Sequence, residues 1–128
     1  MNIGIWAAVA AGGALGSVAR YGTMICVGRL LGAGFPYGTL TVNVIGGLVI
    51  GALAELMALA WSPSATMRAF LTVGILGGYT TFSTFSLDTW LLLEKGLYGP
   101  AILYIVASVI LSVAALVVGL TLMRMALT

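Results

Sequence analysis

Apolar residues fill the chain in long runs that are separated by short segments rich in Gly, Pro and Ser. Such segments mark turns, and here they lie at residues 32–36, 61–66 and 94–100. A helix needs about 20 mostly apolar residues to cross a bilayer, and each run reaches that length. The pattern predicts transmembrane helices over residues 3–31, 36–60, 66–95 and 98–124. The expected fold is an all-α membrane protein with four transmembrane helices in a single domain, residues 1–128.

Composition also favours lipid as the solvent, because 62% of the 128 residues are hydrophobic and 6% are charged. Soluble domains carry about 25% charged residues. The net charge of +2 is small and dispersed, so no nucleic-acid partner is expected. The chain has no His and no paired carboxylates or Ser-His arrangement, and we therefore expect no enzyme active site.

Positive charges near the ends of the spans set the orientation of a membrane protein. The predicted spans place Arg68 and Arg124 on one side of the bilayer and Arg29 and Lys95 on the other. A chain without charge bias can insert both ways up, and two opposite copies can pair as an antiparallel dual-topology homodimer. Alternatively, Arg20 or the terminal amino group makes one side more positive, which would give a single orientation and a parallel oligomer.

The third span contains an unusual segment, residues 74–86, in which three glycines precede a dense run of hydroxyl and aromatic side chains. Such residues are poor material for a continuous helix, so a break is expected near mid-membrane. Carbonyls freed by a break commonly coordinate cations such as sodium, and a two-fold axis there would present each carbonyl twice. A glycine kink satisfied by Ser and Thr side chains is the alternative.

Polar side chains in the other spans suggest an ion path. Asn43 lies about 10 Å below the start of the second span, at 1.5 Å per residue, where it could join two helices or donate to an anion. Phe82 and Phe85 share a helix face and alternate with hydroxyl residues, which favours a pore wall over a lipid contact. The positive edge of a Phe ring can contact an anion weakly.

The fourth span carries a hydroxyl track, since Tyr104, Ser108 and Ser112 recur at a spacing of four residues. These hydroxyls either face a pore or make hydrogen bonds between helices. Arg20 is the one cation inside a span, and it either reaches to the interface or supplies positive potential at a pore mouth.

Acidic residues argue against a proton-coupled transporter, because Glu55, Asp88 and Glu94 lie toward the ends of the predicted spans. A four-span small multidrug antiporter would need a mid-membrane Glu in its first helix, and residues 3–31 contain no acid. A purely structural assembly protein would leave the polar segment of the third span unexplained.

Three ordered motifs give the chain a specific resemblance: residues 12–16 with Arg20 and Tyr21, residues 36–46, and residues 77–86. Together they resemble the Fluc family of fluoride channels, also called CrcB proteins, from the first span to the last. The resemblance implies an antiparallel homodimer with two fluoride pores and a central structural sodium ion (Na+), held by the backbone carbonyls of Gly77 and Thr80. The fluoride-pore residues that it implies are Asn43, Phe82, Phe85, Tyr104, Ser108 and Ser112.

The function that the resemblance implies is a passive channel in the bacterial cytoplasmic (inner) membrane. Such a channel would export cytoplasmic fluoride and so lower fluoride toxicity, without an ATP site or a coupling ion. Its expected partners are the fluoride ion, a second copy of the chain and the lipid bilayer. Without the resemblance, the residues alone predict only an anion-compatible pore in an antiparallel dimer.

Overall fold

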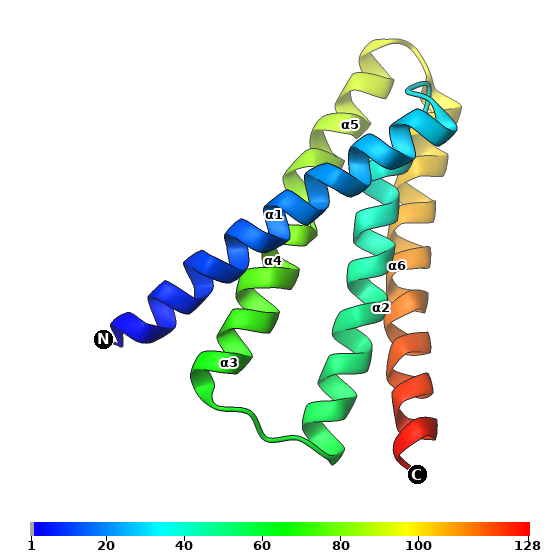
Figure 1. The fold of residues 1–128 in the computed structure, drawn as a ribbon. Coiled ribbons are helices and arrows are strands. Elements are labelled where there is room, and N and C mark those ends of the chain that lie inside the picture. The colour runs from blue at the N-terminus through cyan, green and yellow to red at the C-terminus, as the bar shows by residue number, and fades with distance from the viewer. Residues whose placement is uncertain (1) are drawn as a thin grey trace.

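The computed structural model describes residues 2–128, and within that range all regular structure is helical (Figure 1). Three spans are continuous helices: α1 (Ile3–Leu31), α2 (Tyr37–Leu59) and α6 (Tyr98–Leu127). The other span is divided into α3 (Ala65–Ala69), the wider π-helical segment η1 (Phe70–Leu76), α4 (Gly77–Tyr79) and α5 (Phe82–Glu94). Four segments are long and apolar enough to cross a membrane, which confirms the predicted number of spans. The chain is a multi-pass membrane protein.

Side chains satisfy free backbone amides at the start of two helices, and a glycine follows the end of α1. The side chain of Asn2 accepts a hydrogen bond from the Ile5 amide at 3.4 Å, and Ser64 does the same for Met67 at 3.1 Å. Gly32 follows α1 with φ of 82°, a left-handed conformation that side chains rarely adopt. The predicted boundaries differ by a few residues, mainly because α6 continues to Leu127 instead of ending at residue 124.

Spans that run in the same direction pack in pairs, α1 with η1 and α4, and α2 with α6 (Figure 1). Glycines make both contacts possible. A Cβ atom on Gly47 would lie 2.6 Å from the Ser112 carbonyl oxygen, and one on Gly78 would lie 2.8 Å from the Gly13 carbonyl oxygen. These glycines serve helix packing, since only a missing side chain lets the backbones approach this closely.

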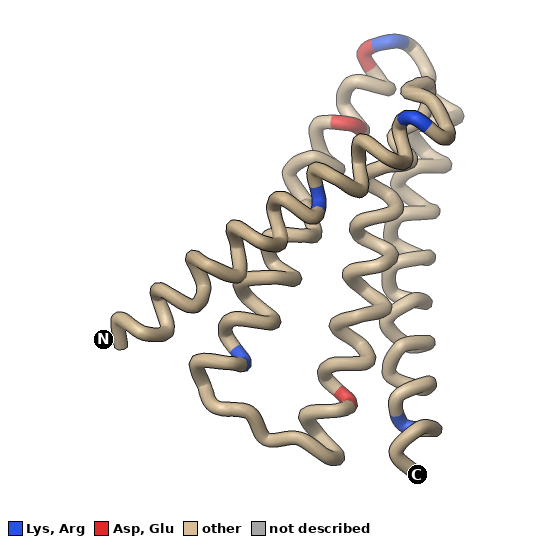
Figure 2. Tube along the Cα trace, in the orientation of Figure 1, with Lys and Arg blue, Asp and Glu red and all other residues tan. Residues whose placement is uncertain are grey.

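Most charged residues lie toward the two ends of the helical bundle, and one cation lies part-way along α1 (Figure 2). Arg29 lies in the last turn of α1, and Arg124 lies in the last turn of α6 at the opposite end. Nε of Arg124 donates to Oε1 of Glu55 at 2.7 Å, and the Glu55 side chain is only 8% exposed. This ion pair joins the end of α2 to the end of α6, and it accounts for a carboxylate that would otherwise be buried without a partner.

Two residues with extended backbone separate α4 from α5. Thr80 has φ of −84° and ψ of 159°, and Thr81 has φ of −152° and ψ of 120°. The side-chain oxygen of Thr81 then accepts a hydrogen bond from the Thr84 amide at 3.1 Å, so Thr81 caps the start of α5. The helical hydrogen-bond ladder is therefore interrupted between α4 and α5.

Candidate ion pathway

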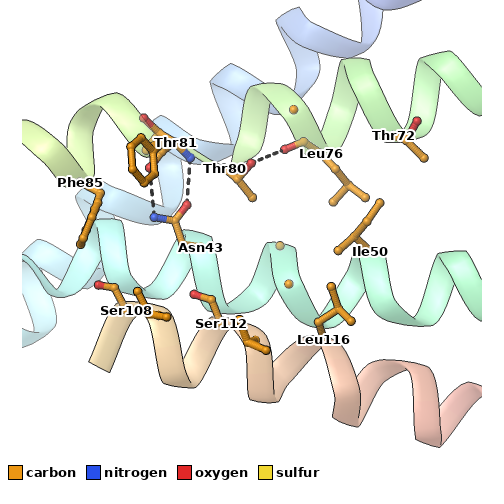
Figure 3. A pocket seen from close by; sticks show the side chains of 16 residues that line it. Asn43, Ile50, Thr72, Leu76, Thr80, Thr81, Phe85, Ser108, Ser112 and Leu116 are labelled. Atoms are coloured by element: carbon orange, nitrogen blue, oxygen red, sulfur yellow. Dashed lines mark hydrogen bonds between the residues drawn. The ribbon is translucent and has the colours of Figure 1, made fainter. Parts of the chain in front are cut away.

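A groove of about 520 Å³ lies between α2, the divided third span and α6 (Figure 3). It brings together five of the six predicted pore residues, which come from three spans. The same groove is lined by both residues that were predicted to hold sodium. These residues are Asn43, Phe82, Phe85, Ser108, Ser112, Gly77 and Thr80.

The Asn43 side chain points from α2 toward the extended residues of the third span (Figure 3). Its Nδ2 donates to the Thr81 carbonyl oxygen at 3.1 Å, and its Oδ1 accepts from the Thr81 amide at 2.9 Å. A primary amide carries two N–H donors, so one donor of Asn43 is left for the groove. Asn43 thus joins two spans, which is one of the two roles considered from the sequence, and the other role, donation to an anion, stays a prediction.

Two buried hydroxyls of α6 line the groove without a hydrogen-bond partner among residues 2–128. They belong to Ser108 and Ser112, and Ser108 as a whole is 6% exposed. An unsatisfied buried hydroxyl costs about 1–3 kcal/mol, so such groups normally meet a partner. Both hydroxyls can rotate to donate, and they are therefore suited to a small anion or to water in the groove.

Two aromatic rings stand at one end of this polar region. The Phe82 and Phe85 ring centroids lie 5.5 Å apart with an interplanar angle of 45°. Phe82 is 79% exposed although it lines the groove, whereas Phe85 packs against the Tyr104 ring at 5.2 Å. Ring edges can thus face an ion without giving it a fixed opposite charge.

Tyr104 and Arg20 do not line the groove, although the sequence placed them in or near the pore. Tyr104 is fully buried behind Phe85, and its hydroxyl donates to Oδ2 of Asp88 at 3.0 Å. The same oxygen accepts from Thr39 at 2.7 Å, so Asp88 connects α2, α5 and α6. Arg20 lies on α1, outside the groove. Their contribution to a pore stays a prediction.

The Gly77 and Thr80 carbonyls suit a cation site. Neither oxygen accepts a backbone or side-chain hydrogen bond from any other part of residues 2–128. In the same range no group of three or more His, Cys, Asp or Glu side chains is placed to hold a metal. Neutral carbonyl oxygens are among the ligands that hard cations accept. One chain supplies two such oxygens.

Comparison with known families decides the membership of the chain. The family described as "CrcB-like protein, Camphor Resistance (CrcB)" matches residues 7–120. The chain belongs to the CrcB family. The resemblance seen in the three sequence motifs is thereby confirmed.

Several CrcB relatives are similar over nearly their whole length. "Fluoride-specific ion channel FluC 1" of Nitrobacter hamburgensis is 56% identical over 117 residues, which cover 91% of this chain and 93% of the relative. "Fluoride-specific ion channel FluC" of Rhodospirillum centenum is 55% identical over 119 residues, 93% of this chain and 94% of the relative. The protein of that name from Caulobacter vibrioides is 53% identical over 117 residues, 91% and 92% of the two chains. These names describe ion channels and no enzyme.

Two residues of this CrcB chain emerge only from the structure. Thr81 binds Asn43 through its backbone and caps α5 through its side chain. A hydroxyl residue directly before a helical run was the available signal for that cap. Asp88 collects two hydroxyl donors from other spans, and no local spacing announces such a contact, because its partners lie 49 and 16 residues away.

Proposed function

We propose that this chain forms a passive, fluoride-selective channel that lets cytoplasmic fluoride leave the cell and so lowers its toxicity. The observation that carries the proposal is a pair of hydroxyls, Ser108 and Ser112, that have no hydrogen-bond partner within residues 2–128. Both are buried in a groove beside Asn43 and two Phe rings. Membership of the CrcB family and the names of its relatives supply the identity of the ion.

Hydrogen-bond donors in the groove can replace part of the water shell of fluoride. The hydroxyls of Ser108 and Ser112 and the free N–H of Asn43 are the donors. Hydrogen bonds to an ionised acceptor are short and strong, which favours the smallest halide. The described residues that line the groove include no charged side chain, so the anion meets no fixed cation that would trap it. Conduction needs this balance of entry and release.

We further propose that two copies assemble as an antiparallel homodimer with two pores. Phe82 lines the groove and is 79% exposed in a single chain. A second copy would cover the exposed ring. The even distribution of cations between the two ends supports insertion in both orientations, in the bacterial cytoplasmic membrane (Figure 2).

The same assembly would complete the sodium site. The interruption between α4 and α5 would lie near mid-membrane on the two-fold axis, where Gly77 and Thr80 of both copies bring four carbonyl oxygens together. A bound sodium ion would supply a central positive charge that joins the two copies. No donor among residues 2–128 makes a hydrogen bond to either carbonyl, which supports this placement.

Labelling of the C-terminus tests the dual topology. In a Cys26→Ser background, Thr128→Cys places the sole thiol beyond the last turn of α6. Because opposite insertion is equally favoured, a membrane-impermeant maleimide should label about half of the protein from each side of the membrane. Permeabilised membranes give the full signal as a control. Labelling from one side alone would contradict the antiparallel assembly.

The proposed driving force predicts a phenotype in cells. Uncharged HF crosses the membrane, dissociates at neutral cytoplasmic pH and leaves as fluoride, which an inside-negative potential drives outward through a passive pore. In a bacterial host without its own fluoride exporter, expression of this chain should restore growth on fluoride and lower the intracellular fluoride concentration. Unchanged fluoride accumulation, with the protein present in the membrane, would contradict the proposal.

A further inference from the structure

The third span is interrupted between α4 and α5, and two side chains accept the amide hydrogens that would otherwise reach the Gly77 and Thr80 carbonyls. In a continuous α-helix each amide donates to the carbonyl four residues earlier. Thr81 would therefore donate to Gly77, and Thr84 would donate to Thr80. These two acceptors are the carbonyls assigned to sodium in the proposed function.

Side-chain oxygens take both amide hydrogens instead. The Thr81 amide donates to Oδ1 of Asn43 at 2.9 Å, and the Thr84 amide donates to Oγ1 of Thr81 at 3.1 Å. No other hydrogen bond within residues 2–128 reaches the Gly77 or Thr80 carbonyl. Each carbonyl of the pair has thus lost its helical donor to a different side chain.

The donors of Thr80 are also directed away from Gly77. Both its amide, at 3.0 Å, and its hydroxyl, at 2.9 Å, donate to the Leu76 carbonyl oxygen. The last turn of α4 is therefore closed on Leu76, one residue before the carbonyl that stays free. Leu76 is the ordinary α-helical acceptor for the Thr80 amide, four residues earlier, so Thr80 supplies no donor to Gly77.

Asn43 also holds the extended peptide from its other side. Nδ2 of Asn43 donates to the Thr81 carbonyl at 3.1 Å. The side-chain amide of Asn43 therefore makes hydrogen bonds to both backbone groups of Thr81. Thr81 is 7% exposed, and a Cβ on Gly46 would collide with the Thr80 methyl group, so α2 lies directly against this segment. The geometry leaves the segment little freedom to return to a helix.

We infer that Asn43 and Thr81 are positioning residues that keep the Gly77 and Thr80 carbonyls available to a cation. The inference rests on the proposed structural sodium ion. Free carbonyls inside a membrane protein are costly unless protein, water or an ion satisfies them. In an antiparallel pair of chains the two side chains of each copy would prepare four oxygens, and Asn43 would connect this site to the fluoride groove that it also lines.

Three variants test the inference: two remove an acceptor oxygen and one keeps it. Thr81→Val removes the hydroxyl and Thr81→Ser retains it. Asn43→Leu removes the acceptor for the Thr81 amide. The readout is the thermal unfolding midpoint of the purified protein in detergent, with sodium replaced by N-methylglucamine at constant ionic strength.

In the wild-type protein the midpoint should rise with sodium. Thr81→Val and Asn43→Leu should need about 10- to 100-fold more sodium for the same rise, the usual loss when a group that orients a metal ligand is removed. Thr81→Ser should respond as the wild type does. Because different side chains free the two carbonyls, the Thr81 pair still tests the inference if Asn43→Leu does not fold.

The outcomes separate the inference from the function on which it rests. If the unfolding midpoint of the wild-type protein does not change with sodium, the proposed sodium site is wrong, and so is the positioning role. A wild-type midpoint that depends on sodium, together with unchanged dependence in Thr81→Val and Asn43→Leu, would overturn the positioning role alone. Fluoride flux does not enter either comparison.

Discussion

Asn43→Asp should lower fluoride flux by about 100-fold or more. The substitution replaces the free N–H donor in the groove by an acceptor that carries negative charge when ionised. Two like charges about 4 Å apart repel by about 4 kcal/mol at an effective dielectric constant of about 20. A rise of about 1.4 kcal/mol in a barrier costs a factor of about ten in rate. Fluoride efflux from reconstituted liposomes measures the loss.

The same chemical change outside the groove provides the control. Asn2 caps α1 by accepting from the Ile5 amide, a role that Asp fills equally well. Asn2→Asp should therefore leave fluoride efflux unchanged. Undiminished flux through well-folded Asn43→Asp protein would remove Asn43 from the pathway.

Removal of both groove hydroxyls, by Ser108→Ala combined with Ser112→Ala, should lower fluoride flux by about 10- to 100-fold. A hydrogen bond to a charged group contributes about 1.5–3 kcal/mol, and water can replace part of what is lost. The unfolding midpoint should not fall, because neither hydroxyl has a partner in the described part of the chain. Efflux and thermal unfolding of the same preparation measure the two effects.

Ser86→Ala is the matched control for the hydroxyl pair. Ser86 is exposed and already donates to the Phe82 carbonyl within its own helix, at 3.0 Å. Its loss should leave flux unchanged. If the double variant instead keeps its flux but unfolds at a lower temperature, the hydroxyls of Ser108 and Ser112 serve helix packing and do not contact the ion.

The fold was largely readable from the sequence, because the bilayer imposes a length on each apolar helix. The four spans follow from turn residues between apolar runs, and the close contacts at Gly47 and Gly78 follow from the spacing of small residues. The groove was readable in part. Asn43, Phe85 and Ser108 were expected in one site, and the packing of three spans does bring their side chains into one groove.

Hydrogen-bond partners were not readable, because each partner is chosen by tertiary packing. The sequence shows that Asn43 is a polar residue in an apolar helix. It does not show that the side-chain amide of Asn43 makes two hydrogen bonds to the backbone of Thr81, 38 residues away. Likewise, Tyr104 fits the spacing of a hydroxyl track, yet Asp88 from a neighbouring helix binds its hydroxyl behind Phe85. Local periodicity describes which face a residue occupies and leaves open what it meets there.

Ion efflux from liposomes that contain the purified protein tests the central claim most directly. Fluoride and chloride are recorded in parallel under a potassium diffusion potential, with no pH gradient across the membrane. A passive fluoride channel predicts fast fluoride loss that follows the imposed potential, together with negligible chloride loss. No fluoride flux, or flux only when a proton gradient is imposed, would contradict the channel and indicate a coupled transporter instead.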